Sequence, residues 1–282
     1  MRKRLKETFA KLLPAEGSVS IYSSFDIIGD IAIIKIPNSS AAKPETIAEA
    51  IMARHGNVKA VFVQTSGITG DYRLRSLKHV AGENRTVTVH RESGCCFAVD
   101  VESCYFSPRL LHERLRIARL VQPDEVVVNM FAGVGCFSII IAKHSQAAKV
   151  FSIDVNPVTV AFMAENIRRN RVYGKVVPLL SDAKTIIETR LQCCADRVLM
   201  PLPEKASAYL PCAVSALKKS GGWIHVHAFE HALKTENPAE KVKQKVAETL
   251  AVLNVDFEVS HIRVVRSTGP NWFQLVADVH IK

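Results

Sequence analysis

The stretch "VVVNMFAGVGCFSIIIAKH", residues 126–144, decides the fold class. An apolar run ends in a loop of small residues that contains Gly133 and Gly135, and an amphipathic segment follows. This order is typical of a buried strand, a turn that faces a phosphate or a nucleoside, and a helix. The stretch therefore predicts a strand–turn–helix unit of a Rossmann-like α/β sheet.

The segments after this unit repeat the same alternation. Apolar runs typical of strands alternate with segments of helical spacing up to "GWIHVHAF" (222–229), and two strand patterns, 256–267 and 273–281, end the chain. Alternation of this kind predicts a parallel sheet wrapped by helices, and the last two strands predict an antiparallel pair that closes it.

The chain before residue 105 has a different pattern of predicted strands and helices. Strand patterns dominate from Val19 onward, and one helix pattern, "PETIAEAIMARHG" (44–56), is inserted among them. We therefore expect two domains, a smaller α+β domain over 1–105 and a Rossmann-like domain over 106–282.

Composition excludes several classes of protein. The 282 residues are 48% hydrophobic and 23% charged, which is ordinary for a globular protein. No apolar run reaches the roughly 20 residues that a membrane span needs. The first 17 residues are basic but lack the apolar centre of a signal peptide, so we expect an amphipathic helix there and a cytoplasmic protein.

Charge and cysteine content indicate the kind of partner. The net charge of +10 favours a polyanion, because lysines and arginines that neutralise phosphates release counterions. The seven cysteines are odd in number and form no C-x-x-C motif, so we expect buried, reduced thiols and no metal site.

The glycine loop indicates which cofactor the sheet binds. A dinucleotide fingerprint requires G-x-G-x-x-G, and here Ser138 occupies the third glycine position. A nucleoside without a pyrophosphate does not require the third glycine, because the glycines of the loop then serve mainly to let the backbone approach the ligand. S-adenosylmethionine (AdoMet) is such a ligand.

Two acids follow at the ends of the next two strand patterns. Asp154 in "FSIDVNP" is placed to accept the two hydroxyls of a ribose, and Asp182 in "LLSDAKT" is placed to accept the amine of adenine. Each acid taken alone is more typical of a helix N-cap, Asp182 in particular. The order of strand, glycine turn, acid, strand and acid predicts AdoMet.

The fourth strand pattern ends in "RVLMPLPE", residues 197–204. Methyltransferases that act on ring nitrogens often have an N-P-P-Y-like turn here, whose rigid carbonyls hold the edge of the base. Pro201, Leu202 and Pro203 occupy this position without the asparagine. The alternative is a plain turn from a loop into a helix, with a proline near the helix start.

Several segments in unbroken order resemble one family, the archaeal and eukaryotic tRNA (guanine-37 N1)-methyltransferases and their wybutosine-pathway relatives. The resemblance extends from about residue 25 to the C-terminus. The matching segments are "GDYRLRSLKHVAGENRTVTVHRESG" (70–94), "YFSPRLLHERLRIA" (105–118), "VVNMFAGVGCFSI" (127–139), "SIDVNP" (152–157), "RVLMPLP" (197–203) and "RVVRSTGPNWFQLVADVHI" (263–281). It implies a class I AdoMet-dependent enzyme, a monomer, that methylates tRNA next to the anticodon, with the anticodon stem-loop as partner and the first domain close to the tRNA.

The resemblance also implies catalytic roles. Glu113 would remove the proton from N1 of guanine, with Arg114 beside it, and Arg73 would stabilise the charge that develops towards O6. A closed pocket would make Glu113 a better base, because desolvation of its carboxylate raises its pKa towards neutrality. From the residues alone, a solvated helix face is the favoured interpretation of Glu113, with arginines at 109 and 116, and only the resemblance reverses it.

Cofactor contacts carry over to positions in and after the glycine loop. They are Phe131, Gly133, Gly135, Asp154, Asn156 and Asp182. Two positions depart from the family pattern: Asn129 stands where an aspartate is usual, and Pro201 where N1-methylating members have asparagine. An archaeal subgroup thought to methylate both guanosine and a tricyclic wyosine precursor also varies at this turn, so dual activity stays open.

Residues 1–18 are too few for the small domain that touches the tRNA elbow in many archaeal relatives, so we expect weaker discrimination by overall tRNA shape.

Three rival functions remain. The wybutosine-pathway aminocarboxypropyl transferases share the fold, but they tend to have a glycine–tyrosine pair in place of the proline turn. A non-catalytic RNA-binding protein is compatible with Asn129 and Pro201. An NAD-dependent dehydrogenase is disfavoured by Ser138.

Overall fold

The computed structural model describes residues 25–36 and 43–282. The helix expected over the first 17 residues lies outside this range. The chain divides into two compact units, the first formed by Met1–Glu92 with Cys96–Pro108 and the second by Ser93–Cys95 with Arg109–Lys282. Each unit is described by itself.

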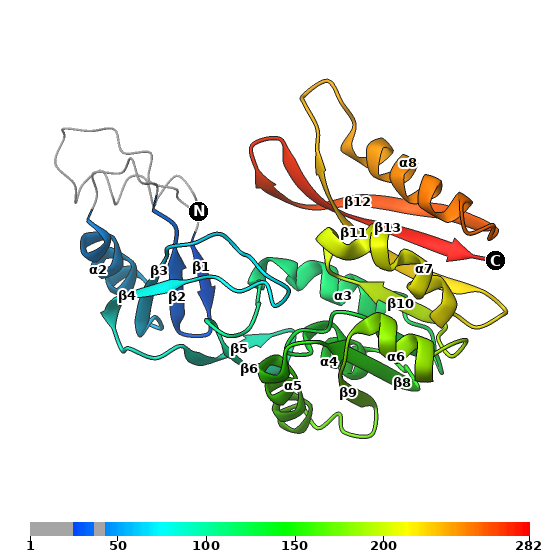
Figure 1. Ribbon diagram of the computed structural model, residues 1–282. Coiled ribbons are helices and arrows are strands. Elements are labelled where there is room, and N and C mark those ends of the chain that lie inside the picture. Colours follow the sequence, from blue (N-terminus) through cyan, green and yellow to red (C-terminus); the bar gives the residue numbers. More distant parts are fainter. Residues whose placement is uncertain (1–24, 37–42) are drawn as a thin grey trace. The chain divides into compact units, whose positions relative to one another are not determined.

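The described residues of the first unit form a four-stranded mixed sheet, one helix and a separate β-hairpin (Figure 1). In sheet order the strands are β1 (Asp26–Ile28), β2 (Ile31–Ile34), β3 (Ala60–Gln64) and β4 (Leu77–Gly82), helix α2 is Pro44–Arg54, and the hairpin is β5 (Val87–Glu92) with β6 (Cys95–Asp100). The pair β2–β3 is parallel, and the outer pairs are antiparallel. Ile47 and Ile51 of α2 pack on Ala32, Ile34 and Val61 of the sheet, which gives this unit its own core.

Two features of the first unit differ from the sequence expectation. The strand-rich pattern over 19–36 contains a turn at Gly29 and Asp30, so its described part forms two short antiparallel strands. Strand β4 was not predicted, because "LKHVAG" has no apolar alternation and remains half exposed at the sheet edge. An edge strand is held by the backbone bonds of its neighbour, and the side-chain pattern does not record them.

The second unit is built on a seven-stranded sheet. Its strands in order of position are β12 (Phe257–Gly269), β13 (Trp272–Ile281), β11 (Gly222–His231), β10 (Arg197–Met200), β7 (Val126–Asn129), β8 (Lys149–Asp154) and β9 (Val176–Leu180). The strands from β11 to β9 run parallel, and β13 and β12 are antiparallel additions. The predicted fold class, a parallel sheet with a C-terminal antiparallel pair, is confirmed.

Helices cover both faces of this sheet (Figure 1). One face carries α3 (Leu111–Leu120), α4 (Cys136–His144) and α5 (Pro157–Arg169); the other carries α6 (Ala183–Arg190), α7 (Ala206–Ala216) and α8 (Pro238–Ala251). The strands bury near-continuous apolar runs because both faces are covered. The core under α6, α7 and α8 includes Ile187, Leu210, Val246 and Leu275.

Strand order places a switch point beside β7. From β7 the chain continues outward through β8 and β9, and it then returns to the opposite side of β7 to form β10. In open α/β sheets ligands bind at the carboxyl ends of the strands next to such a point. The glycine loop after β7 lies at this edge.

Candidate functional site

The glycine loop has the backbone of a ligand-facing turn. Gly133 and Gly135 have φ values of 57° and 91°, in the left-handed region that favours glycine. Gly135 is the N-cap of α4, and a Cβ atom there would lie 3.0 Å from Cγ of Met163. The position therefore requires glycine for its φ and for the close approach of α5.

Asn129, which departs from the family pattern, ties the end of β7 to the first turn of α4. The side chain is fully buried, its Nδ2 donates to Oγ of Ser138 at 3.1 Å, and its Oδ1 accepts from the Phe131 amide at 3.4 Å. An amide supplies both a donor and an acceptor, whereas a carboxylate supplies only acceptors. Ser138, at the position of the missing third glycine, is therefore the partner of Asn129, and the sequence analysis did not foresee this pairing.

Asp154 lies where the pattern predicted, at the carboxyl end of β8. Its Oδ2 accepts from the Gly133 amide at 2.8 Å, and its Oδ1 accepts from the Asn156 amide at 3.0 Å. Burial raises the pKa of the Asp154 carboxyl, and these two backbone donors oppose the shift. The carboxylate thus fixes the loop and keeps lone pairs for hydroxyl donors. Asn156 is buried and caps α5, accepting from the amides of residues 158 and 159.

Asp182 follows β9 and has two roles. Its Oδ1 caps α6, as the alternative interpretation of the sequence expected, and its Oδ2 accepts from the hydroxyl of Tyr209 at 2.6 Å. The Tyr209 ring meets Phe131 of the glycine loop edge-on, with centroids 5.3 Å apart. Tyr209 was missed by the sequence analysis, because only the packing of α7 brings it to Asp182.

The surroundings of these groups fit an adenosine. Val155 and Leu180, next to the two acids at the strand ends, are 42% and 56% exposed although they are apolar. Apolar side chains flanking polar groups that fix orientation are typical of small-molecule sites. The residues present can therefore hold the nucleoside part of AdoMet.

The proline turn after β10 leads directly into a helix. Leu202 is buried, Pro203 begins a short 3-10 helix (Pro203–Lys205), and α7 follows. The local structure is that of the plain loop-to-helix turn, and its position at the carboxyl end of β10 brings it to the same edge of the sheet as the glycine loop.

Glu113 is not on a solvated helix face, so that alternative interpretation was wrong. Its side chain is 0% exposed, and the Arg116 guanidinium donates to both carboxylate oxygens, at 3.0 Å from Nε and 2.7 Å from Nη2. Arg263 of β12 lies 3.7 Å from Oε2. Helix α3 turns the face that carries Glu113 inward onto the sheet. The sequence periodicity did not show whether this face is buried or solvated.

Arg116 is itself held from the other side. Asp278 of β13 accepts from Nη1 of Arg116 at 2.6 Å and from Nη2 at 3.0 Å, and it also bonds Nδ1 of His225. Burial alone would raise the pKa of Asp278, but its bonds to His225 and Arg116 outweigh burial and hold the pKa well below its usual range. Burial lowers the pKa of His225.

The network continues away from Glu113. Nε2 of His225 lies 2.7 Å from Nη1 of Arg197, which forms a two-bond ion pair with Glu125 at 2.7 and 2.9 Å. Since Arg197 can only donate, His225 accepts at Nε2 and carries its proton on Nδ1, facing Asp278. Five ionisable groups therefore fix the position of Glu113 through one buried chain of bonds.

Arg114 is buried beside Glu113 on α3. Its guanidinium carbon lies 5.8 Å from the centroid of the Phe137 ring. Phe137 meets the buried His227 of β11 edge-on at 6.0 Å. Burial lowers the pKa of His227 to about 4, so this ring is neutral at physiological pH.

Arg73 belongs to the first unit. It ends a tight turn with φ of 56°, and its guanidinium carbon lies 4.2 Å from the centre of the Tyr105 ring. A cation over an aromatic face is attracted by the ring quadrupole, which holds the side chain in one orientation.

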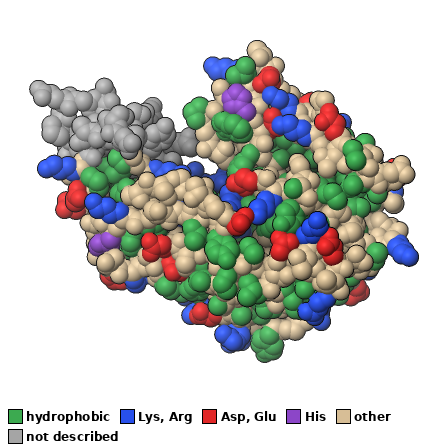
Figure 2. Space-filling view, in the orientation of Figure 1, with side chains coloured by type: hydrophobic (Ala, Val, Ile, Leu, Met, Phe, Trp, Pro, Cys, Tyr) green, Lys and Arg blue, Asp and Glu red, His purple; other side chains and the backbone are tan. Residues whose placement is uncertain are grey.

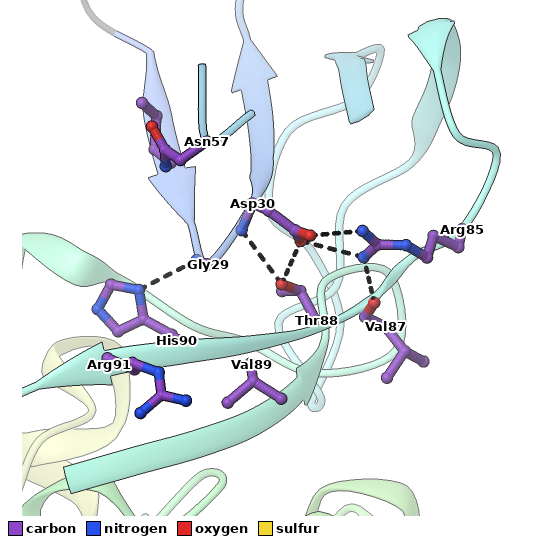
Figure 3. Close-up of a pocket in the computed structure, with 10 residues that line it drawn as sticks. Gly29, Asp30, Asn57, Arg85, Val87, Thr88, Val89, His90 and Arg91 are labelled. Atoms are coloured by element: carbon purple, nitrogen blue, oxygen red, sulfur yellow. Dashed lines mark hydrogen bonds and ion pairs between the residues drawn. The ribbon is translucent and has the colours of Figure 1, made fainter. Parts of the chain in front are cut away.

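A cavity of about 630 Å³ lies within the first unit, between the β1–β2 turn and β5 (Figure 3). Asp30 accepts from Arg85 and from Thr88 at its rim, and His90 accepts from the Gly29 amide. The bond from Arg85 lowers the pKa of Asp30 despite burial. None of the predicted site residues lines this cavity, and the sequence analysis did not foresee it.

Three further observations concern metals, thiols and membranes. Over residues 25–36 and 43–282 no cluster of three or more His, Cys, Asp or Glu side chains is arranged to bind a metal ion. All seven cysteines are free thiols; four are buried, as expected, whereas Cys96 and Cys194 are half-buried and Cys193 is exposed. Within the same ranges no helix is both long and apolar enough to cross a bilayer.

Fold and site together define a Rossmann-like methyltransferase domain preceded by a smaller α+β unit. Residues 88–254 match the TRM5/TYW2 methyltransferase domain, and residues 5–86 match the TYW2 N-terminal domain. The chain belongs to the TRM5/TYW2 methyltransferase family, which confirms the resemblance found in the sequence.

Two relatives named for their activity are similar to this chain in sequence. The chain is 40% identical over 269 residues to the tRNA (guanine(37)-N(1))-methyltransferase Trm5b of Pyrococcus abyssi, a match that covers 95% of this chain and 78% of the relative. It is 36% identical over 264 residues to the tRNA 4-demethylwyosine(37)-methyltransferase Taw21 of Saccharolobus solfataricus, covering 92% of this chain and 94% of the relative.

Solved structures agree with this assignment. The structure of aTrm5 in complex with tRNALeu matches with a TM-score of 0.78 and 33% identity, over 100% of this chain and 76% of that one. The crystal structure of Methanocaldococcus jannaschii TYW2 in complex with AdoMet matches with a TM-score of 0.66 and 27% identity, over 92% and 99%.

Proposed function

We propose that this protein uses AdoMet to methylate N1 of guanosine 37 in tRNA. The single observation that carries the proposal is the buried Glu113, held by Arg116 in the same unit that contains the glycine loop. The 40% identity to a relative of that activity supports it. The net charge of +10 suits an RNA partner.

The cofactor is expected at the carboxyl edge of the sheet. Asp154 would accept the ribose hydroxyls, Asp182 the adenine amine, and Phe131 with Tyr209 would supply an aromatic wall. Asn129 and Asn156 would act through the backbone that they hold. AdoMet, when bound, supplies an electrophilic methyl group on a sulfonium and leaves as a neutral thioether.

Glu113 would take the proton that N1 loses as the methyl group arrives. An ionised carboxylate has about four lone-pair positions, and Arg116 occupies two of them, so two remain for the N1 proton. Arg116 and Arg263 place positive charge next to the two carboxylate oxygens of Glu113. His227 is neutral, so it adds no positive charge near the Glu113 carboxylate.

Other residues would act on the base itself. Arg73 would stabilise the charge that develops on O6. Arg114 would help to position Glu113, beside which it is buried on α3. Pro201, Leu202 and Pro203 would hold the edge of the base through rigid backbone carbonyls. The first unit would lie close to the anticodon stem-loop, and we expect a cytoplasmic monomer.

The test is mass spectrometry of nucleosides from an unmodified tRNA transcript treated with the protein and methyl-labelled AdoMet. We expect labelled 1-methylguanosine at position 37, and none from a transcript with adenosine at that position. Label in another nucleoside, or in the position-37 variant, would refute the proposal.

A second candidate is methylation of a tricyclic wyosine precursor, alone or together with guanosine. The 36% identity to a 4-demethylwyosine methyltransferase and the TYW2-type N-terminal domain favour it. A tRNA that carries 4-demethylwyosine, offered beside the transcript, separates the two substrates. AdoMet labelled in its carboxyl carbon detects aminocarboxypropyl transfer, the third possibility, because only that reaction moves this label into RNA.

A further inference from the structure

An aromatic pair, one ring exposed and the other half-buried, lies at the free end of the β12–β13 hairpin. Trp272, the first residue of β13, is 48% exposed and pairs in register with His231, the last residue of β11. The two rings meet at 60° with centroids 5.3 Å apart. The Ala232 amide donates to the Asn271 carbonyl at 2.9 Å, so the backbone on both sides of the pair is fixed.

This pair lies on the sheet face that also carries Glu113. Alternate residues of a strand share a face, and so do residues paired across strands. Trp272, Gln274 and Val276 therefore follow one another on this face of β13, with Arg266 opposite Gln274 and Arg263 opposite Val276. Since Arg263 contacts Glu113, a single row connects the aromatic pair with the proposed base.

The row is long enough for a short segment of unpaired strand. Trp272 and Val276 are four strand residues apart, which is about 13 Å. Between them Arg266 donates to Oε1 of Gln274 at 2.7 Å, and Nε2 of Gln274 lies 3.4 Å from Nδ1 of His227. An aromatic surface followed by arginines is a combination that binds unpaired nucleic acid, since every base has a π-face and the strand is anionic.

The charged side chains on and beside the row indicate which kind of partner it could bind. On the face that Figure 2 shows, basic and acidic side chains are interspersed over this unit. The two carboxylates on the row, Glu113 and Asp278, are already paired with Arg116. Arg263 and Arg266 each add a guanidinium to the row, a group that suits a phosphate backbone.

We propose that Trp272, backed by His231, is a stacking platform for an unpaired nucleobase that neighbours the methylated guanosine. The proposal rests on the proposed function, because that function brings the guanosine to Glu113. Stacking on Trp272 would fix the strand beside the target base and so make binding depend on a neighbouring base that Glu113 never touches.

The experiment measures the affinity of an anticodon stem-loop RNA by fluorescence anisotropy, with AdoMet present. Trp272→Ala should weaken binding by about 5- to 150-fold, the range for loss of one stacked base. Trp272→Phe should restore most of the affinity because it keeps a ring. Val264→Ala is the matched control: Val264 is 43% exposed on the same hairpin but pairs with Leu275 on the opposite face, so its loss should leave the affinity unchanged.

RNAs with an abasic site on either side of the target nucleotide complete the test. One of the two abasic RNAs should bind the wild-type protein as weakly as Trp272→Ala binds intact RNA, and the two changes together should cost no more than either alone. Additive losses, or an unchanged affinity in a Trp272→Ala protein that unfolds at the wild-type temperature, would overturn the platform. Failure of the wild-type protein to bind any stem-loop would instead refute the proposed function.

Discussion

Replacement of Asp278 by asparagine tests whether the buried network fixes Glu113. The carboxylate is 7% exposed and accepts two bonds from Arg116 and one from His225. An asparagine of the same shape has one oxygen, and its NH2 group would face donors of Arg116 or His225. At least one charged bond is lost, and Arg116 keeps one carboxylate partner instead of two.

The expected cost at pH 7 is about 3–5 kcal/mol of unfolding free energy for the second unit, the range for removing one partner of a buried ion pair. Exposed pairs contribute far less. Glu165 and Arg169 on α5 are 38% and 44% exposed, so Glu165→Gln should cost below about 1 kcal/mol and serves as the control.

The sign of the pH dependence follows from the depressed pKa. Asp278 has a folded-state pKa below the ordinary 3.8, so its contribution is fully present above about pH 4 and is lost as the pH falls further. Wild-type protein should therefore lose stability faster than Asp278→Asn in acid, and the difference between them should shrink below pH 4.

Both tryptophans, Trp223 and Trp272, belong to the second unit, so tryptophan fluorescence during urea unfolding reports this unit alone. A loss below 1 kcal/mol for Asp278→Asn at pH 7, or a difference from wild type that stays constant into acid, would contradict the reasoning.

Four further changes test the site. Glu113→Gln should lower kcat by about 10²- to 10⁴-fold and leave AdoMet affinity by calorimetry unchanged; an active variant would remove Glu113 from the chemistry. AdoMet affinity should fall as the pH drops towards the pKa of Asp154, which burial raises above 3.8, because ribose hydroxyls bind the ionised form; Asp154→Asn should bind more weakly and show no such pH dependence. Tyr209→Phe should weaken AdoMet about tenfold by releasing Asp182, and equal affinities in calorimetry would count against this contact. Gly135→Ala should destabilise the second unit by about 1–3 kcal/mol in urea unfolding, because φ is 91° and Met163 is close; a neutral result would mean that the loop relaxes.

Sequence reasoning placed the proposed cofactor residues at the carboxyl ends of strands because each of them directly follows a strand pattern. Gly133, Gly135, Asp154 and Asp182 follow strands whose apolar runs are unmistakable, and parallel strands bring their carboxyl ends to one edge. The same reasoning missed Tyr209 and Ser138. Their partners, Asp182 and Asn129, are contacted through the packing of helices, and no local pattern encodes a contact of that kind.

Glu113 illustrates the limit more sharply. Its helix periodicity allowed a solvated face, and only the family resemblance favoured a functional role. The structure buries the side chain between α3 and the sheet, with Arg116, Asp278 and Arg263 around it. Asp278 is 165 residues away in the chain, so sequence spacing cannot reveal that the two carboxylates share one arginine.

By itself the sequence determined the alternation of strands and helices, the glycine turn and the acids that follow it, because hydrophobic period and turn chemistry are local properties of the chain. Only the tertiary structure decided that Glu113 is buried, that a chain of ionisable groups holds it, and that the pair of Trp272 and His231 lies on the same sheet face. Those outcomes depend on which strands pair and which helix face turns inward. Both are set by the free energy of burying the whole core, to which every distant segment contributes.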